Sequence, residues 1–297
     1  MTRRGLLLFA AMCVIWGIPY LLIRVAVNEI SPVMLVFART GIGALILMPV
    51  VIARGGLRGI GRRWIPLLAF ALAEIGLPWV FVSSAEQHIS SSLAGLLVSA
   101  VPLLGVLVAP LFGNRERMGP LAIGGLALGV AGVASIVGLN FHASDVTALL
   151  EMAVVVVGYA LGPAILGRYM KGVPSVSVIG ISLSVCALAY APLAASHWPR
   201  VMPGPWVLVS VGVLAVVCTA LAFLLFFGLI AEIGPVRSTV ITYINPAVAA
   251  ILGIAILHER FTLGMGIGFV LVLAGSVLAT RRRPAPAASP RQARPEP

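Results

Sequence analysis

The sequence contains few charged residues. Only 10% of its 297 residues are charged and only nine are acidic, whereas 60% are hydrophobic and the mean hydropathy is +1.10. A soluble protein of this length could not bury so much apolar surface. The composition therefore excludes a soluble globular domain and indicates an all-α polytopic membrane protein, whose partner on most of its surface is membrane lipid.

Motifs for catalysis and nucleotide binding are also absent. The chain has no His-Glu-x-x-His zinc site, no Gly-x-Ser-x-Gly nucleophile turn and no phosphate-binding loop ending in Gly-Lys-Ser/Thr. The four histidines follow no metal-ligand spacing. We therefore expect no enzymatic activity, no ATP-driven pump, no cofactor and no metal.

Cysteine is scarce, and the basic residues are dispersed. Cys13, Cys186 and Cys218 lie inside apolar runs and are odd in number, so we expect buried thiols rather than a disulfide framework. The formal net charge is +11, but the basic residues occupy short gaps between apolar runs. This distribution is typical of membrane topology and argues against a nucleic-acid partner.

Ten apolar segments are long enough to cross the roughly 30 Å hydrocarbon core of a bilayer as helices. They cover residues 5–24, 32–53, 64–83, 91–112, 119–137, 146–167, 174–195, 206–230, 235–257 and 261–280. Most arginines fall on the side that carries both chain ends, and this predicts that both termini are cytoplasmic. Residues 281–297 are rich in arginine, proline and alanine, which predicts a disordered basic cytoplasmic tail.

One unit occurs twice in the chain. Pro102 interrupts the fourth apolar run and Pro246 interrupts the ninth, and Glu116-Arg117 aligns with Glu259-Arg260 at an offset of 143 residues (259 minus 116). Each copy contains five spans, an odd number, so the second copy must be inverted relative to the first. The two five-helix repeats are residues 5–137 and 146–280.

Polar residues inside the spans are the candidates for a substrate cavity, because a charge at the bilayer centre costs about 3 kcal/mol. Glu74 lies near the middle of the third span, with Pro78 and Phe81 on the same helical face. It either binds a proton or a substrate ammonium group, or it is a neutral acid hydrogen-bonded to a neighbouring helix. Arg39 and Glu151, in the second and sixth spans, are candidates for a structural ion pair.

Two faces of small or polar residues match between the copies. They are formed by Ser92, Gly95, Ser99 and Pro102 in the fourth span and by Ser238, Thr242, Asn245 and Ala249 in the ninth. These faces either line a cavity or allow two helices to pack closely. Pro102 and Pro246 would be flexible points within their helices, because proline removes a backbone hydrogen bond.

Aromatic residues add to the candidate cavity. Trp16 and Tyr159 occupy matching positions in the first and sixth spans, too deep for interfacial residues. They either stack on a substrate or pack inside the protein. Trp79 follows Glu74 by five residues, which is about 140° around an ideal α-helix, so we do not expect it in the same cavity.

With these features the chain resembles the drug/metabolite transporter superfamily, and within it the EamA family of ten-helix proteins. The resemblance covers nearly all of residues 5–280. It is carried by Trp16-Gly17, by Ala38-Arg39 and by the two matching units, which close with residues 113–117 and 258–260.

The resemblance implies a secondary carrier of the bacterial inner membrane that works by alternating access and often exports amino acids or other small metabolites. Its cavity would be lined by the first, third, fourth, sixth, eighth and ninth helices. Where many relatives have a small polar residue after Trp-Gly, this chain has Ile18-Pro19, so Pro19 would alter one wall of the cavity. Proton coupling, and a monomer or a homodimer, are left open. The alternatives are a non-transporting scaffold or sensor, and a channel.

Overall fold

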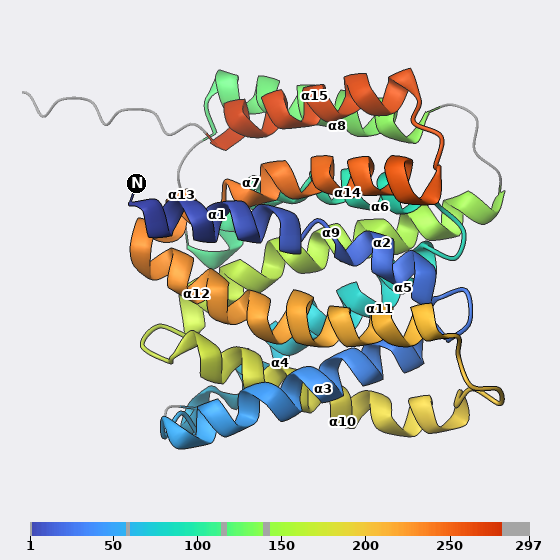
Figure 1. Ribbon diagram of the computed structural model, residues 1–297. Helices are drawn as coiled ribbons and strands as arrows, with labels where there is room; N and C mark the ends of the chain where they lie inside the picture. Colours follow the sequence, from blue (N-terminus) through green and yellow to red (C-terminus); the bar gives the residue numbers. More distant parts are fainter. Residues whose placement is uncertain (1, 58–59, 114–117, 139–142, 281–297) are drawn as a thin grey trace, which may run out of the picture.

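The computed structural model describes residues 2–57, 60–113, 118–138 and 143–280, and every regular element in these ranges is a helix (Figure 1). The elements are α1 (Arg3–Ile15), α2 (Pro19–Ala26), α3 (Pro32–Ala53), η1 (Gly61–Arg63), α4 (Trp64–Phe70), η2 (Ala71–Gly76), α5 (Leu77–Ala85), α6 (Ser91–Val98), α7 (Val101–Val108), η3 (Ala109–Phe112), α8 (Pro120–Val137), α9 (Ala143–Tyr169), α10 (Ser175–Ser196), α11 (Pro205–Ala215), η4 (Val216–Leu221), α12 (Ala222–Ile233), α13 (Pro235–Ser238), α14 (Ile241–Leu257) and α15 (Leu263–Thr280). η1 and η3 are 3-10 helices, whereas η2 and η4 are π-helices. Glu116-Arg117 and the predicted tail at 281–297 lie outside the described residues.

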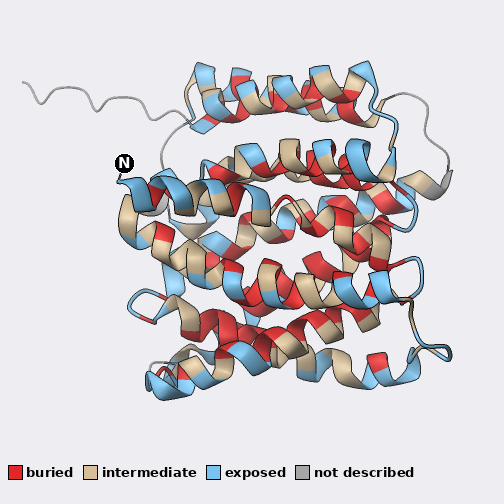
Figure 2. Ribbon diagram, in the orientation of Figure 1, coloured by how far each residue is buried: buried red, intermediate tan, exposed pale blue. Residues whose placement is uncertain are grey.

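Nine stretches of the described chain are long and apolar enough to cross a membrane, either as one helix or as joined helices. α14 is a further apolar helix of 17 residues, which makes ten. Large apolar side chains are exposed on the outer faces of α8 and α15, among them Leu121, Val130 and Val270 (Figure 2). The polytopic all-α architecture is therefore confirmed, with lipid as the natural solvent of these faces.

The two halves pack through matching helices. The second helices of the two halves, α3 and α10, lie side by side, as do the fifth helices, α8 and α15 (Figure 1). The fourth helix of one half meets the fourth of the other through α6 and α14. The first helix contacts the third helix of the other half in both directions, α2 with α11 and α5 with α9. Such reciprocal pairing is the architecture of two inverted repeats.

The contact between α8 and α15 brings backbone against backbone. A Cβ added at Gly125 would lie 2.7 Å from the carbonyl oxygen of Gly275, and one added at Gly132 would lie 2.7 Å from that of Gly268. Small residues are what allow membrane helices to approach this closely. The pair forms one edge of the bundle (Figure 1), away from the helices that hold the candidate site.

The fourth and ninth helices meet at one end of the bundle. α1 begins and α15 ends at the same end, which we call the terminal end (Figure 1). At the opposite end α6 packs on α14, where a Cβ at Gly95 would lie 2.6 Å from the Cβ of Ala249. Towards the terminal end, α7, the second part of the fourth helix, packs against α9 and α15 rather than α14. The two helices are thus closed on each other at the opposite end.

Several spans are interrupted. The first breaks at residues 16–18, and the fourth breaks at Ser99 and Ala100, just before Pro102. The ninth predicted span is wrong as a continuous helix, because residues 239 and 240 separate α13 from α14. α14 nevertheless runs through Pro246 without a break. The two prolines, predicted as equivalent flexible points, therefore have different surroundings.

Candidate functional site

Arg39 is a charge buried inside the bundle. It lies on α3, and its side chain is only 7% exposed. Its Nε donates to the hydroxyl oxygen of Thr219 at 2.9 Å, and its guanidinium carbon lies 3.6 Å from the centroid of the Trp79 ring. A desolvated cation–π contact of this kind is worth about 2 kcal/mol. The third and eighth spans therefore fix the position of the guanidinium group.

The part of the chain that the structure describes places no negative charge against Arg39. Apart from Thr219, the polar groups that face it are Tyr159, Tyr20 and Cys218, all uncharged at neutral pH. A guanidinium group keeps its charge in proteins, and a buried charge is costly without a partner. An anion from outside the chain, such as a carboxylate, would therefore be stabilised here.

Glu74 lies on the π turn η2 and faces α9. Its Oε2 is buried and has no hydrogen-bond partner among the described residues. A side chain at Gly162 would overlap this oxygen, so the glycine provides the space for the acid. Tyr159, one turn earlier on α9, interacts electrostatically with both Glu74 and Arg39. An acid, a phenol and a guanidinium group are thus brought into one region.

The two π turns occupy matching places in the two halves. Glu74 is the fourth residue of η2, and Thr219 is the fourth residue of η4. A π turn changes the backbone pairing, and side chains satisfy carbonyls near both turns: Tyr190 donates to Gly76 at 2.9 Å and Thr219 to Leu214 at 2.8 Å. Single π turns inside α-helices are frequent at functional sites.

Asn245 ties the ninth span to the break in the first. The amide of Gly17 donates to Val14 at 2.9 Å, which leaves the carbonyl of Cys13 without its helical donor. With its amide nitrogen turned toward these acceptors, Asn245 donates to the carbonyls of Cys13 at 2.9 Å and Ile241 at 3.0 Å. Its position is therefore explained by a buried carbonyl that needs a donor.

Trp16 lies apart from Tyr159. Its ring packs against Phe223 and Phe226 of α12, with centroid separations of 5.8 and 4.7 Å. Tyr159 instead faces Arg39 and the π turn of the third span. The matching positions of the two aromatic residues in the repeats do not bring them to one binding surface.

Three further predicted cavity residues have mainly packing contacts. Pro19 is buried and begins α2. Pro78 is buried against α9, where a Cβ at Gly158 would lie 2.7 Å from it. Phe81 packs against the apolar core. Of this group, Pro78 lies nearest to Glu74 in the chain and contacts the same helix.

The predicted faces of the fourth and ninth spans serve different roles along their length. Near the opposite end their small residues pack the two helices together, as one of the two interpretations of the sequence proposed. Further along, Ser99 and Thr242 donate to backbone carbonyls three residues earlier, at 2.5 and 2.7 Å. Pro102 is half-buried at the start of α7, and Pro246 is buried within α14.

The ion pair expected between Arg39 and Glu151 is not formed. Arg39 donates to Thr219, and Glu151 accepts a hydrogen bond of 2.7 Å from the hydroxyl of Ser84. Each side chain therefore has its own partner on a neighbouring helix. The physical reason is that Trp79 and Thr219 hold the guanidinium group against the third and eighth spans, away from the start of α9.

Trp79 and Thr219 are functional candidates that the sequence did not reveal. The expectation that Trp79 lies outside the cavity of Glu74 stays a prediction, and it assumed ideal α-helical rotation between the two residues. The π turn lies within this interval and reduces the rotation per residue. Thr219 could have been found by aligning the repeats at an offset of 145 residues (219 minus 74) in this region.

Metal and thiol chemistry have no evident centre here. Within the ranges that the structure describes, no group of three or more His, Cys, Asp or Glu side chains could hold a metal ion. The three cysteines are free and buried. The arrangement instead suits the binding of a small molecule that carries charges of both signs.

Known proteins resemble the chain over both halves. The EamA-like transporter family matches residues 3–138 and 146–281. An uncharacterized transporter of Bacillus subtilis (strain 168), YvbV, is 26% identical over 288 residues, which are 95% of this chain and 92% of that protein. An uncharacterized inner membrane transporter of Escherichia coli (strain K12), YedA, is 27% identical over 286 residues, 90% of each chain.

The fold is also found in a solved crystal structure. It is 22% identical in sequence and superposes with a TM-score of 0.67, covering 93% of this chain and 97% of that chain. The family match and the structural match both extend across the first and the second half. The chain belongs to the EamA-like transporter family and is a multi-pass membrane transporter.

Proposed function

We propose that this protein is a secondary carrier that exports amino acids or related zwitterionic metabolites across the bacterial inner membrane by alternating access. The observation that carries the proposal is that buried Arg39 and Glu74, whose Oε2 is buried, both interact electrostatically with Tyr159. An amino acid presents a carboxylate to a guanidinium group and an ammonium group to a carboxylate. The Tyr159 hydroxyl would form a hydrogen bond with the carboxylate or the ammonium group of the amino acid.

The distribution of basic residues supports an orientation with both termini in the cytoplasm. The opposite end holds only three arginines of the described chain, Arg24, Arg200 and Arg260. The terminal end holds Arg3, Arg4, Arg54, Arg62, Arg63, Arg168, Lys171 and Arg237. An excess of arginine and lysine is typical of the cytoplasmic side. The terminal end is therefore the inner end of the carrier, and the opposite end is the outer end.

The closed contact between α6 and α14 supports an inward-facing state. In the proposed orientation this contact seals the outer end, while α7 turns to α9 and α15 on the inner side. Alternating access would exchange this contact for an equivalent one at the inner end.

Glu74 also supports proton coupling. Without a bound ammonium group, its buried oxygen has no partner in the described chain, and a proton would neutralise it. Exchange of this proton for the ammonium group of the substrate would couple export to inward proton movement.

Efflux from proteoliposomes tests the substrate class. We expect purified protein to release labelled amino acids in a saturable manner, and Arg39→Gln to lower kcat/KM by roughly tenfold to hundredfold, since hydrogen bonds to charged groups contribute about 1.5–3 kcal/mol. Arg200→Gln, which changes an exposed arginine at the outer end, is the matched control and should transport normally.

The same assay separates the alternatives. Release that does not saturate would indicate a channel, and no release of any zwitterion would favour a scaffold or sensor. If Arg39→Gln impaired release of simple amines as strongly as that of amino acids, the assignment of Arg39 to the carboxylate would be wrong. Glu74→Gln should abolish the response of efflux to an imposed pH gradient, and an unchanged response would exclude Glu74 as the proton site.

A further inference from the structure

Glu86 is a buried acid that lies outside the proposed substrate site. It follows α5 directly, its side chain is 0% exposed, and neither carboxylate oxygen has a hydrogen-bond partner in the described part of the chain. Arg24 donates to the backbone carbonyl of Glu86 and not to its carboxylate. The acid is therefore buried without the partner that a buried carboxylate requires.

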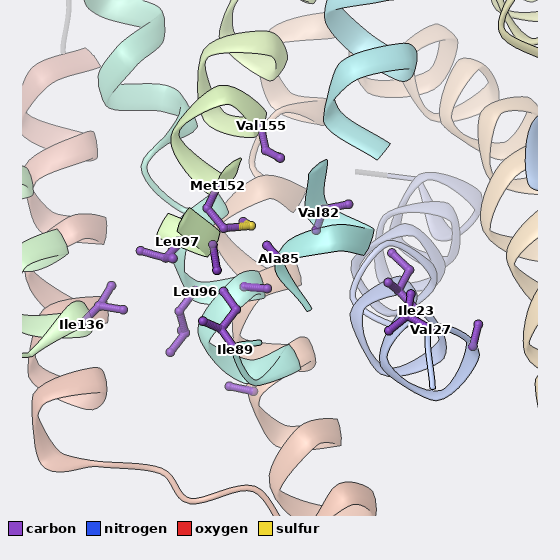
Figure 3. Packing of buried hydrophobic residues seen from close by; sticks show 14 of the residues in the cluster. Ile23, Val27, Val82, Ala85, Ile89, Leu96, Leu97, Ile136, Met152 and Val155 are labelled. Atoms are coloured by element: carbon purple, nitrogen blue, oxygen red, sulfur yellow. The ribbon is translucent and has the colours of Figure 1, made fainter. Parts of the chain in front are cut away.

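The chain segment that carries Glu86 is packed among apolar side chains. The chain neighbours of Glu86 pack with residues of the fourth and sixth spans in one cluster, which includes Val82, Ala85, Ile89, Leu96, Leu97 and Met152 (Figure 3). An ionised carboxylate among these side chains would lose its hydration. This burial raises the pKa of Glu86 well above its ordinary value.

A second acid, Glu259, closes the same end of the bundle. Its carboxylate accepts hydrogen bonds from the backbone amides of Ser91 at 2.8 Å and Ser92 at 2.9 Å, and from the hydroxyl of Ser92 at 2.5 Å. These donors belong to the first turn of α6, where the helix dipole favours negative charge. Because Glu259 follows α14, this contact locks the fourth helix to the ninth.

Glu259 acts on the ionisation of Glu86. The negative charge of Glu259 opposes ionisation of Glu86 and adds to the effect of burial on its pKa. Arg24 on α2 acts in the other direction but with a smaller effect than burial, and Tyr20 on the same helix faces both Glu86 and Arg39. α6 faces the pair with serines, which do not titrate.

The remaining neighbour, α9, carries Asp145 in its first turn and Glu151 two turns further along. Glu151 accepts the hydroxyl of Ser84, two residues before Glu86. His258 and Arg260, on either side of Glu259, are exposed to solvent. Among the described residues, the charged groups that act on the ionisation of Glu86 are Glu259 and Arg24.

We infer that Glu86 and Glu259 form a proton-binding site at the outer end of the carrier, which takes up one proton when the fourth and ninth helices close there. The inference rests on the proposed function for its orientation and for alternating access. When the helices separate, water reaches Glu86, the acid ionises, and its charge repels that of Glu259. Closing the outer end reverses these steps and withdraws one proton from the outer solution.

The direction of the pH effect follows from linkage. The closed state binds the proton more tightly than the open state, so low pH favours closure. As pH rises from the ordinary pKa of the hydrated acid to the raised pKa of the buried acid, the ratio of closed to open molecules falls by about tenfold per pH unit. This site is distinct from Glu74, which lies in the middle of the third span.

Distance measurements between spin labels test the inference without any substrate. The exposed residues Gln87 and Arg260 lie on the two sides of the closure, and the native cysteines are buried, so Gln87→Cys and Arg260→Cys provide a specific label pair. In lipid nanodiscs we expect the short-distance population to fall from acid to alkaline pH. A population that does not change with pH would overturn the proposal.

Three variants identify the groups responsible. Glu86→Gln should stay closed at every pH, because the amide has the shape of the protonated acid but cannot ionise. Glu259→Gln should move the transition to higher pH, because an ionised Glu86 then meets no negative charge at residue 259. Glu29→Gln, an exposed acid at the same end, should behave as wild type.

The shift expected of Glu259→Gln follows from the repulsion that this variant removes. With a neutral residue at 259, an ionised Glu86 no longer repels its neighbour in the closed state, so closure persists to higher pH than in the wild type. The glutamine oxygen can still accept from the Ser91 and Ser92 amides, which preserves part of the cap. A wild-type pH profile in Glu86→Gln would overturn the proton site, and one in Glu259→Gln would overturn the participation of Glu259.

These outcomes are separable from those of the proposed function. A carrier without amino-acid efflux could still show pH-dependent closure, and the spin-label experiment would detect it. Conversely, normal efflux with a pH-independent outer end would leave the substrate assignment intact and remove this site alone.

Discussion

Gly162 illustrates, at the scale of single residues, how little space surrounds the acid of the candidate site. A methyl group at this position would overlap the Oε2 atom of Glu74. Gly167 lies five residues further along the same helix, is exposed, and has no neighbouring atom within 4 Å of an added Cβ. The two glycines therefore allow a comparison in which only the surroundings differ.

Gly162→Ala should displace the Glu74 side chain and remove most amino-acid efflux, whereas Gly167→Ala should transport normally. Alanine also stabilises a helix by about 0.5–1 kcal/mol relative to glycine, so Gly167→Ala should unfold at the wild-type temperature or slightly above it. Efflux from proteoliposomes and thermal unfolding of the purified protein measure the two effects. Similar efflux from both variants would show that transport does not depend on the position of Glu74.

The same scale shows what the sequence could and could not predict. Glu74 was identifiable because an acid in an apolar span is costly and therefore conspicuous. The contact of Arg39 with Trp79 and Thr219 was not, because it joins residues from three spans and depends on two π turns. No periodicity argument that assumes 3.6 residues per turn can place side chains beyond such a turn.

At the scale of elements, the fourth helix divides into two parts with different tasks. Gly95 on α6 lies against Ala249, while Gly105 on α7 has no atom within 4 Å of an added Cβ. The sequence showed a face of small residues but not which part of it packs against another helix and which part does not. The distinction depends on how the helices diverge, and the same pattern is compatible with an open or a closed end.

Gly95→Ala should therefore prevent full closure of the outer end, because its methyl group would lie 2.6 Å from the Cβ of Ala249. A cysteine introduced at the buried Ala94 would then react with a membrane-impermeant maleimide added from outside. The same cysteine should stay protected in the wild-type background and in Gly105→Ala. Protection in the Gly95→Ala background would mean that the helices adapt without opening.

At the scale of the whole molecule, hydropathy and the odd number of spans per repeat were sufficient to predict ten helices in two inverted halves. Each span is an independent apolar run, so its existence does not depend on the neighbours. The pairing of α8 with α15 and of α3 with α10 follows from the inversion once the halves are assembled. The conformational state does not follow from either property.

The orientation of the whole molecule is testable with reporter fusions. A fluorescent protein fused after Thr280 should be active, because it folds in the cytoplasm, and alkaline phosphatase at the same site should be inactive. Alkaline phosphatase inserted beside Arg200, in the connection between α10 and α11, should give the opposite result. The physical reason is the excess of basic residues at the terminal end. A reversed pattern would assign α6 and α14 to an inner closure.

The correspondence of Glu74 with Thr219 in the two repeats has a consequence for the orientation of a bound substrate. Both halves contain a π turn, but the side chains at the matching positions differ. Glu74 on the first π turn corresponds to Thr219 on the second, and the Thr219 hydroxyl accepts a hydrogen bond from the guanidinium group of Arg39. The arrangement of charged groups is therefore asymmetric, although the helices that carry them follow the symmetry of the two repeats. Under the proposed function, a zwitterionic substrate would place its ammonium group toward Glu74 on the first π turn and its carboxylate toward Arg39, which Thr219 holds beside the second π turn, and it would keep this orientation while access alternates.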